Sequence, residues 1–518
     1  MALPGKYLAK NPDFFEIYDG KDITVWSINN HQLEDKVYTY DEAIDLAGTG
    51  WYVIGMSVLL CMALEGMALD MFGFSVVVSS ACDLEITHIQ KSILISMPFL
   101  GSIILAYPWG YFSDTQGRLK SLRFSLWGSF ILASISAFSP NWIVLAVLKF
   151  CSSSFSSGIQ SIGLTLLGES CSTKLKGKLV IGVTFSLFIS FAVYNIWAYF
   201  ILSLDFAFDL GFIIFKPWRL LALVLALPLG ISLVLANYFC ESPKFVLNSG
   251  HERRAVKLLT KISERNGIKV NTYPVKRVVL HETTSLRKKD YSLLQSLMDQ
   301  TFPLFKPPLL YRIVQLFYIT TVVYATNNGF YAWFPLVMET FNTGNDKNVA
   351  ADNLCGLISN YKELNNNEMC ITSVTEFSVW VSLIQGVLYG VLIFIVAWLN
   401  GRKKTVLIIL LFISSTSGFF IPLVPGRILS ICLFCGFMIN SVCLAIIFSY
   451  YVDMFPTSYR GMAACLGVMV ARISALAGTN LVGAYLVTHC ANSLYSWSAF
   501  VLSGLVVSCF LPPDKPKK

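Results

Sequence analysis

The residues best suited to chemistry are four ionisable side chains that interrupt long apolar stretches, namely Glu65, Asp70, Lys149 and Arg472. A charge at the centre of a bilayer costs about 2.5–3.5 kcal/mol on insertion scales, so each needs a ligand, water or a partner. In a functional interpretation, Arg472 binds an anionic group of a substrate, and Glu65 titrates or binds a cation. In a structural interpretation, a Glu65–Arg472 pair only fixes the helix register. The sequence leaves both interpretations open. For Asp70 and Lys149 we favour a structural pair, with substrate binding as the alternative.

A second candidate segment, from Asn327 to Trp333, combines two asparagines and a glycine with the aromatic residues Tyr331 and Trp333. An Asn-Asn-Gly run weakens a helix, and irregular backbone at membrane depth is tolerated only where it faces protein or water. We therefore expect a hinge in the outer half of this span. Asn327 and Asn328 would then be ligands, and Tyr331 and Trp333 would stack on an organic substrate. The alternative is that Tyr331 and Trp333 belong to an aromatic belt at the membrane surface.

Membrane-spanning helices must position these residues, because the composition excludes a soluble fold. Of the 518 residues, 55% are hydrophobic and 14% are charged, whereas a soluble domain carries about 25% charged residues. A span needs about 20 mostly apolar residues. Twelve segments are candidates, of which the third and the twelfth are short: 51–75, 92–112, 122–138, 142–167, 179–203, 218–239, 309–336, 377–399, 404–424, 427–451, 461–487 and 494–511.

The distribution of charge predicts the orientation of these spans. With both termini in the cytosol, most of the 39 Lys and Arg residues lie on the inner side, as the positive-inside rule requires. The first 20 residues have no apolar core, so we do not expect a cleaved signal peptide. The net charge of +8 is not gathered in a basic stripe, so no nucleic-acid partner is expected. The partners implied are the lipid bilayer and a small-molecule substrate, and we expect a monomer.

An internal repeat divides the chain into two halves. Gly117-Arg118 after the second span is repeated by Gly401-Arg402 after the eighth, and Glu169 by Asp453 at the same offset. This predicts a duplicated six-span unit, with a substrate site between parallel halves. The predicted parts are a cytosolic arm (1–50), a first half (51–239), a cytosolic linker (240–308) with a helix over 249–264, a second half (309–511) with an outer loop (337–376), and a cytosolic tail (512–518).

Three motifs resemble the signatures of the major facilitator superfamily. They are Gly110 to Arg118 after the second span, Glu241-Ser242-Pro243-Lys244 after the sixth, and Asp453 to Gly461 after the tenth. Further stretches resemble the synaptic vesicle glycoprotein 2 group, namely Met62–Gly66, Trp218-Arg219, Asn328–Pro335 and Ala471–Ala475. The resemblance implies an all-α membrane protein of twelve helices in two pseudo-symmetric halves, working by alternating access. It also implies that spans 1, 4, 7 and 10 line the cavity.

The resemblance further implies a latch of charge bridges on the cytosolic side, which closes the inner face when the cavity opens outward. Its residues would be Asp114, Arg118, Glu169, Glu241, Arg402, Asp453 and Arg460. The alternative, ordinary loop turns with positive-inside charges, explains the lysines of these loops but not Asp114 together with Glu169.

Four cysteines lie on the predicted outer side: Cys82, Cys355, Cys370 and Cys490. Four cysteines allow three connectivities, and we favour a Cys355–Cys370 disulfide because these two share a loop. The chain has no phosphate-binding Gly-x-x-x-x-Gly-Lys-Ser/Thr motif and no hydrolase or zinc-protease motif. We therefore expect neither an ATP-driven pump nor an enzyme, and no metal or cofactor apart from a coupled proton.

Together these features predict a secondary-active or facilitative carrier of a small organic solute, with an organic anion as one candidate. It would lie in the plasma membrane or in an intracellular vesicle membrane. The alternative is a carrier-fold receptor or regulatory vesicle membrane protein that does not transport. Trp398 favours it, because Trp398 stands where the family's second loop motif has Asp. A channel is a third option, although no filter-like sequence suggests one.

Overall fold

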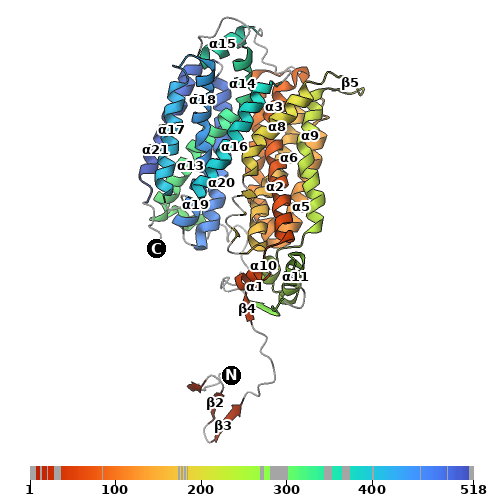
Figure 1. Cartoon of the computed structure of the whole chain (residues 1–518), viewed down its shortest axis with the longest axis vertical. Helices are drawn as coiled ribbons and strands as arrows, with labels where there is room; N and C mark the ends of the chain where they lie inside the picture. The colour runs from red at the N-terminus through yellow and green to blue at the C-terminus, as the bar shows by residue number, and fades with distance from the viewer. Residues whose placement is uncertain are drawn as a thin grey trace.

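The computed structural model describes most of the chain, in segments. These are residues 8–11, 14–19, 22–27, 37–84, 86–172, single positions between 175 and 183, 185–268, 273–279, 301–343, 353–364, 374–398, 402–455, 457–486 and 488–512. Within them, long helices run side by side in two bundles (Figure 1). The lower end of α21 and helix α1 (Tyr40–Leu46) lie at one end of the molecule, called here the inner end. Helix α15 (Leu354–Leu364) lies at the opposite, outer end (Figure 1).

The first bundle holds six spans. They are α2 (Trp51–Phe72) continued by α3 (Phe74–Ser80), α4 (His88–Gln116), α5 (Arg118–Ser136), α6 (Trp142–Ser170), α8 (Ser186–Leu202), and α9 (Pro217–Leu235) continued by η2 (Ala236–Tyr238). The helix α5 is the most polar, because it begins with Arg118, Lys120 and Arg123. Short elements at the outer end connect the spans: η1 (Cys82–Leu84) and a hairpin of β5 (Phe208–Asp209) with β6 (Ile214–Phe215).

The second bundle holds the other six spans. They are α13 (Leu309–Ala332) continued by α14 (Phe334–Thr343), α16 (Glu376–Trp398), α17 (Lys403–Phe420), α18 (Arg427–Met438) joined through η5 (Ile439–Val442) to α19 (Cys443–Met454), α20 (Thr457–Tyr485) and α21 (Cys490–Cys509). Ten of the described helices are long and apolar enough to cross a bilayer. With the polar α5 and the shorter α8, they make the twelve transmembrane helices in two halves that the sequence predicted.

A small substructure covers the inner end of the first half (Figure 1). It consists of β4 (Val37–Thr39), α1, α10 (Pro243–Asn248), α11 (Glu252–Arg265) and β7 (Arg277–Val279). The short helix η4 (Phe302–Phe305) packs against the start of the second half instead. The strand β4 pairs in parallel with β7, so the arm and the linker form one small sheet. Helix α11 is the linker helix expected over 249–264. Nearer the amino terminus of the arm, β1 (Leu8–Asn11), β2 (Phe14–Asp19) and β3 (Asp22–Ser27) form an antiparallel sheet.

Glycines let the helices within each half approach closely. A Cβ at Gly478 of α20 would lie 2.1 Å from the carbonyl oxygen of Ala325 of α13, and one at Gly329 would lie 2.9 Å from that of Gly478. Similarly, a Cβ at Gly101 of α4 would lie 2.2 Å from the carbonyl oxygen of Phe150 of α6. Small residues permit such backbone approach between helices in lipid, where the hydrophobic effect does not hold the helices together.

Among the described residues, the main contacts between the two halves are those of α4 with α20, α8 with α16, and α3 with α14. Glycines again mark the contacts, since a Cβ at Gly483 would lie 2.4 Å from Ser92 Oγ, and one at Gly386 would lie 2.9 Å from the carbonyl oxygen of Phe188. The Gly483 contact and the α3–α14 contact lie toward the outer end. The rings of Phe185 and Phe394, with centroids 5.9 Å apart, meet nearer the inner end, so the described contacts between the halves extend over most of the depth.

The predicted disulfide pairing is wrong. Cys355 is bonded to Cys490, with the two Cα atoms 5.5 Å apart. The reason is that α15 folds over the outer end of α21 and does not close its own loop; the neighbouring Asn353 side chain donates a hydrogen bond of 2.5 Å to the carbonyl oxygen of Pro422. Cys370 lies outside the described residues. Cys82 is also disulfide-bonded.

We expect Gly478→Ala to destabilise the protein by about 1–3 kcal/mol, because α13 and α20 must separate to make room for the new methyl group. Gly110→Ala is the matched control, since a Cβ at this helical glycine meets nothing within 4 Å. Thermal unfolding of the purified variants in detergent measures the difference. An unfolding temperature of Gly478→Ala equal to that of Gly110→Ala would contradict the close crossing.

Candidate functional site

One face of α13 is turned toward the other half of the molecule. Tyr324, Asn327, Asn328 and Tyr331 follow one another at spacings of three and four residues, which places them on one side of the helix. The Tyr331 ring stacks on Phe191 of α8, in the first half, with ring centroids 3.9 Å apart. This stacking fixes the direction of the face: it lies at the interface between the halves.

The interruption expected in the outer half of this span is present, but not at the Asn-Asn-Gly run. Helix α13 continues through that run, where the Asn328 side chain donates a 3.0 Å hydrogen bond to the carbonyl oxygen of Tyr324. The helix ends at Ala332, and α14 starts after Trp333. Pro335 contributes to the break, because it has no amide hydrogen with which to continue the bonding ladder.

The two aromatic residues of this segment do not form a lipid-facing belt, because both are buried. The Trp333 indole nitrogen donates a 3.2 Å hydrogen bond to the carbonyl oxygen of Thr479. The Tyr331 hydroxyl accepts one of 3.2 Å from Gln385 of α16, which also donates to the Tyr389 hydroxyl at 3.2 Å. Both aromatic side chains are therefore held by polar contacts inside the protein.

A second irregular element, missed in the sequence, lies in the tenth span. The 3-10 turn η5 interrupts the span between α18 and α19, and it carries Asn440 and Ser441. Asn440 has no exposed surface, and neither atom of its amide has a hydrogen-bond partner among the described residues; the same holds for Ser441 Oγ. An Asn-Ser pair in the middle of the apolar run 427–451 was the signal that could have identified it.

Glu65 and Arg472 do not pair with each other in this structure. Both carboxylate oxygens of Glu65 are buried without a hydrogen-bond partner among the described residues, and so is Nε of Arg472. The Arg472 side chain is only 8% exposed. The Tyr324 hydroxyl lies within electrostatic range of it. The Glu65–Arg472 pair that would merely set the register is therefore not formed.

Several of the buried polar groups without partners lie at one depth, at the middle of the spans that carry them. We call Glu65, Thr326, Asn327, Asn440, Ser441 and Arg472 the central polar set. They come from the midpoints of the first span (Trp51–Ser80), of α13 with α14, of α18 with α19, and of α20. An unpaired buried polar group costs about 1–3 kcal/mol, and a charged one costs more. Several such groups at one level, on helices of both halves, indicate a place where water or a solute supplies the missing bonds.

Asp70 and Lys149, in contrast, satisfy each other. They form a buried ion pair in which the two side chains are 2% and 3% exposed. Ser152 Oγ donates a 2.9 Å hydrogen bond to the second carboxylate oxygen, and the Lys149 ammonium lies 4.7 Å from the centroid of the Phe74 ring. These contacts support the structural interpretation, a pair that fixes α2 against α6.

Four predicted latch residues meet at the inner end of the first half. Gly117, with φ of 108°, makes the tight turn that brings the end of α4 to the start of α5. Arg118 lies 2.8 Å from Asp114 and 3.4 Å from Glu169 at the end of α6. The carboxylate of Glu241 accepts the amide hydrogens of Leu119 and Lys120, at 2.9 and 3.3 Å, and so caps α5.

The amino-terminal arm is attached to this cluster. The Tyr40 hydroxyl donates a 2.5 Å hydrogen bond to the backbone oxygen of Glu169, whose carboxylate accepts another of 2.5 Å from Ser242. Burial, together with the negative charge of Glu169, raises the pKa of the Tyr40 hydroxyl well above its usual range. Tyr40 therefore stays protonated, and its hydrogen bond persists at every physiological pH.

The corresponding cluster of the second half is described only in part. Arg402 is exposed and precedes α17, and the side chains of Asp453 and Arg460 lie outside the described residues. Among the described side chains, no ion pair joins the inner ends of the two halves. The charge bridges seen at this end hold one half together internally.

Two parallel six-helix halves, with open polar groups at middle depth and charged motifs at the inner ends, define a membrane carrier fold. The chain belongs to the Major Facilitator Superfamily, whose sequence profile matches residues 58–479. It is 24% identical over 487 residues to the synaptic vesicle 2-related protein of Pongo abelii, covering 92% of this chain and 81% of that relative. It is also 28% identical over 239 residues to the putative transporter svop-1 of Caenorhabditis elegans, covering 46% and 44%. The predicted resemblance to this group is confirmed.

Solved structures support the same fold. The inward-open xylose transporter XylE from E. coli superimposes with a TM-score of 0.61 and 15% identity, covering 90% of this chain and 98% of that one. At this identity the likeness shows the fold alone. The chain is therefore a multi-pass membrane protein of a transporter family.

We expect Asp70→Asn alone to destabilise the protein by about 3–5 kcal/mol, because it leaves the Lys149 ammonium buried and unpaired. Adding Lys149→Met to this variant should restore most of the loss. Thermal unfolding in detergent measures both, with Glu252→Gln as the control, since its pair with Arg277 is exposed. A single Asp70→Asn variant as stable as the parent would disprove the structural role of the pair.

Proposed function

We propose that this protein is a secondary carrier that moves a small organic solute across the bilayer by alternating access, with an organic anion as the favoured class. The observation that carries the proposal is the central polar set, above all the buried Arg472 guanidinium with an unpaired Nε. A guanidinium presents several N–H donors in a rigid fork that matches carboxylate and phosphate groups. An anionic group of the solute would supply the missing acceptor.

The rest of the set supplies the remaining contacts of such a site. Asn327 and Asn440 offer both donors and acceptors from the second half. Tyr324 and Tyr331 border the same face of α13 and offer aromatic surface to an organic body. The functional interpretation of Asn327 therefore retains support, whereas the Asn328 and Trp333 side chains already bond to the protein.

Glu65 is the residue through which a proton would be coupled. A carboxylate without a partner in a low-dielectric site is stabilised by taking up a proton. Transport energy would come from that proton or from the solute gradient alone. The name of the Arabidopsis thaliana relative, organic cation/carnitine transporter 7, makes organic cations the second class to test, since an ionised Glu65 would suit them.

The motion would be a rocking of the two halves about their shared contacts, with both termini in the cytosol. The positive-inside distribution supports this orientation. The bridges of Arg118 with Asp114 and Glu169 would keep the inner end of the first half in one shape during the motion. We further propose that the protein acts as a monomer in the plasma membrane or in a vesicle membrane, without enzymatic activity.

The test is uptake by purified protein in proteoliposomes, with labelled organic anions, organic cations and sugars at two pH values. For the solute that is transported, Arg472→Ala should lower uptake by about tenfold to a hundredfold, since a hydrogen bond to a charged group contributes about 1.5–3 kcal/mol. Arg277→Ala, at an exposed arginine, is the control. Uptake unchanged in Arg472→Ala would refute the role of Arg472. Specific solute binding without faster tracer exchange would replace the carrier by a receptor.

Proton coupling has its own prediction. Glu65→Gln should remove the pH dependence of uptake, because the amide cannot exchange a proton, while solute-driven exchange between equal concentrations continues. Initial rates from pH 5.5 to 8 measure this, with about the same protein per vesicle in each preparation. A parent protein whose uptake does not vary with pH would rule out the coupled proton and leave a facilitative carrier.

A further inference from the structure

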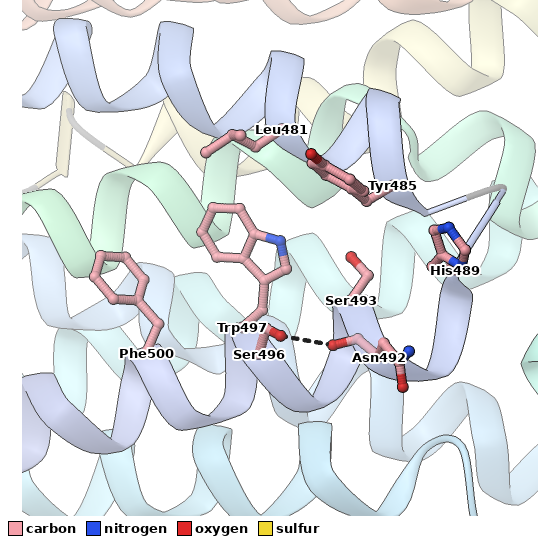
Figure 2. Close-up of a pocket in the computed structure, with 8 residues that line it drawn as sticks. All are labelled: Leu481, Tyr485, His489, Asn492, Ser493, Ser496, Trp497 and Phe500. Atoms are coloured by element: carbon pink, nitrogen blue, oxygen red, sulfur yellow. Dashed lines mark hydrogen bonds between the residues drawn. The ribbon is translucent and has the colours of Figure 1, made fainter.

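A groove that the transport cycle does not use lies between α20 and α21, near the outer end. Its volume is about 600 Å³, within the range of about 300–1,000 Å³ of small-molecule sites. Leu481 and Tyr485 of α20 form one wall, and Trp497 and Phe500 of α21 form the other (Figure 2). His489 lies at the end where the two helices are connected (Figure 2).

The groove is separate from the central polar set. Leu481 is nine residues after Arg472, which is two and a half turns at about 3.6 residues per turn, so the two side chains leave α20 on opposite sides. Leu481 is 49% exposed and Tyr485 is similarly exposed. Such exposure at the outside of a bundle in a membrane means contact with lipid, so the groove opens to the bilayer.

The groove changes in polarity with depth. Helix α21 runs inward from Cys490, so His489, Asn492 and Ser493 lie near the membrane surface. Phe500 lies about 15 Å deeper than Cys490, at a rise of about 1.5 Å per residue. The polar end is anchored by the disulfide between Cys355 and Cys490. An occupant of this groove would therefore have a small polar head near the membrane surface and a long apolar body.

Two hydrogen-bonding groups in the groove have no partner among the described residues. Ser493 is buried, and its Oγ is unpaired. Figure 2 shows that this hydroxyl points into the space between Tyr485 and Trp497 and that the indole nitrogen of Trp497 is turned toward it. Ser496, in contrast, donates a 2.7 Å hydrogen bond to the backbone oxygen of Asn492. The Ser493 hydroxyl as acceptor and the Trp497 indole nitrogen as donor would suit a single hydroxyl group of an occupant.

The occupant's head should be uncharged. The described lining contains no Lys, Arg, Asp or Glu, whereas anionic lipid headgroups are recognised by clusters of Lys and Arg. The rings of Trp497 and Phe500 pack edge to face, with centroids 5.7 Å apart and planes at 74°; this fixed aromatic wall suits a rigid ring system better than a flexible acyl chain. We propose that this groove binds a sterol from the outer leaflet, with its hydroxyl group toward Ser493.

The experiment uses the full chain in phosphatidylcholine vesicles that contain a photoactivatable cholesterol analogue, followed by mass spectrometry of the labelled peptides. We expect labels on α20 and α21 around the groove, which unlabelled cholesterol removes. Leu481→Trp should fill the groove and lower this labelling by about tenfold. Leu502→Trp is the matched control, because Leu502 of α21 is 47% exposed and lies outside the lining.

The outcomes separate a sterol from other occupants. Equal labelling of the Leu481→Trp and Leu502→Trp variants would overturn the proposal. Removal of the label by lysophosphatidylcholine but not by cholesterol would also overturn it, in favour of an acyl chain. If Leu481→Trp does not fold, Tyr485→Ala takes its place and should lower the labelling at the polar end of the groove. The groove lies on the opposite side of α20 from Arg472. The labelling result therefore does not decide whether the protein is a carrier, and the uptake result does not decide whether the groove binds a sterol.

Discussion

The cost of a polar group without a partner inside a membrane organises this structure. Most such groups are satisfied locally: Arg219 at the outer end of α9 donates to the backbone oxygens of Ala137 and Ser139, at 2.9 and 2.7 Å, and Asp70 pairs with Lys149. The central polar set differs from the other unpaired groups because several of its members stay open at one depth, on helices of both halves. Arg219 also lies 3.7 Å from the Asp83 carboxylate, although its Nε has no hydrogen-bond partner among the described residues, whereas no hydrogen-bond acceptor or carboxylate partner of Arg472 lies among them. The open groups therefore mark the place where a solute or water takes part.

The sequence was sufficient for the fold because the signals that specify it are local and repeated. Apolar length, positive-inside charges and the duplicated Gly-Arg motif each depend on short stretches, and the twelve spans appear where these stretches predicted them. The Asp70–Lys149 pair was also predictable, because two opposite charges at similar depth must be neutralised. The meeting of the four latch residues of the first half was predictable as well, because charged side chains at the ends of neighbouring helices lie close together where those ends meet.

The errors came from interactions that depend on tertiary packing. The Asn-Asn-Gly run looked like a weak point of a helix, but Gly329 packs against Gly478, and Asn328 bonds to its own helix, so the helix continues. The real break lies at Trp333. Pro335 contributes to it because it has no amide hydrogen to donate to the carbonyl oxygen of Tyr331, four residues earlier. The disulfide was assigned by closeness in sequence, whereas α15 crosses to α21 and pairs Cys355 with Cys490. Asn440 was overlooked because one polar residue hardly lowers the hydropathy of a long apolar run.

The same packing also divides the protein into two bodies that could move against each other. In the first body, the arm is held by Tyr40 on Glu169, by Asn266 on the backbone oxygens of Ala47 and Gly48 at 3.0 and 2.9 Å, and by the pairing of β4 with β7. In the second, the Gly329–Gly478 crossing and the disulfide hold the helices and the outer loop together.

The contacts described between the bodies are of another kind: the stacked rings of Phe191 and Tyr331, and packing across Gly386 and Gly483. Such contacts are apolar or purely steric, and apolar attraction has no preferred direction. Moving one half against the other would then break few directional bonds, whereas deforming either half would break many. The central polar set has Glu65 in the first half and its other members in the second, so a solute bound between them would contact both halves at once.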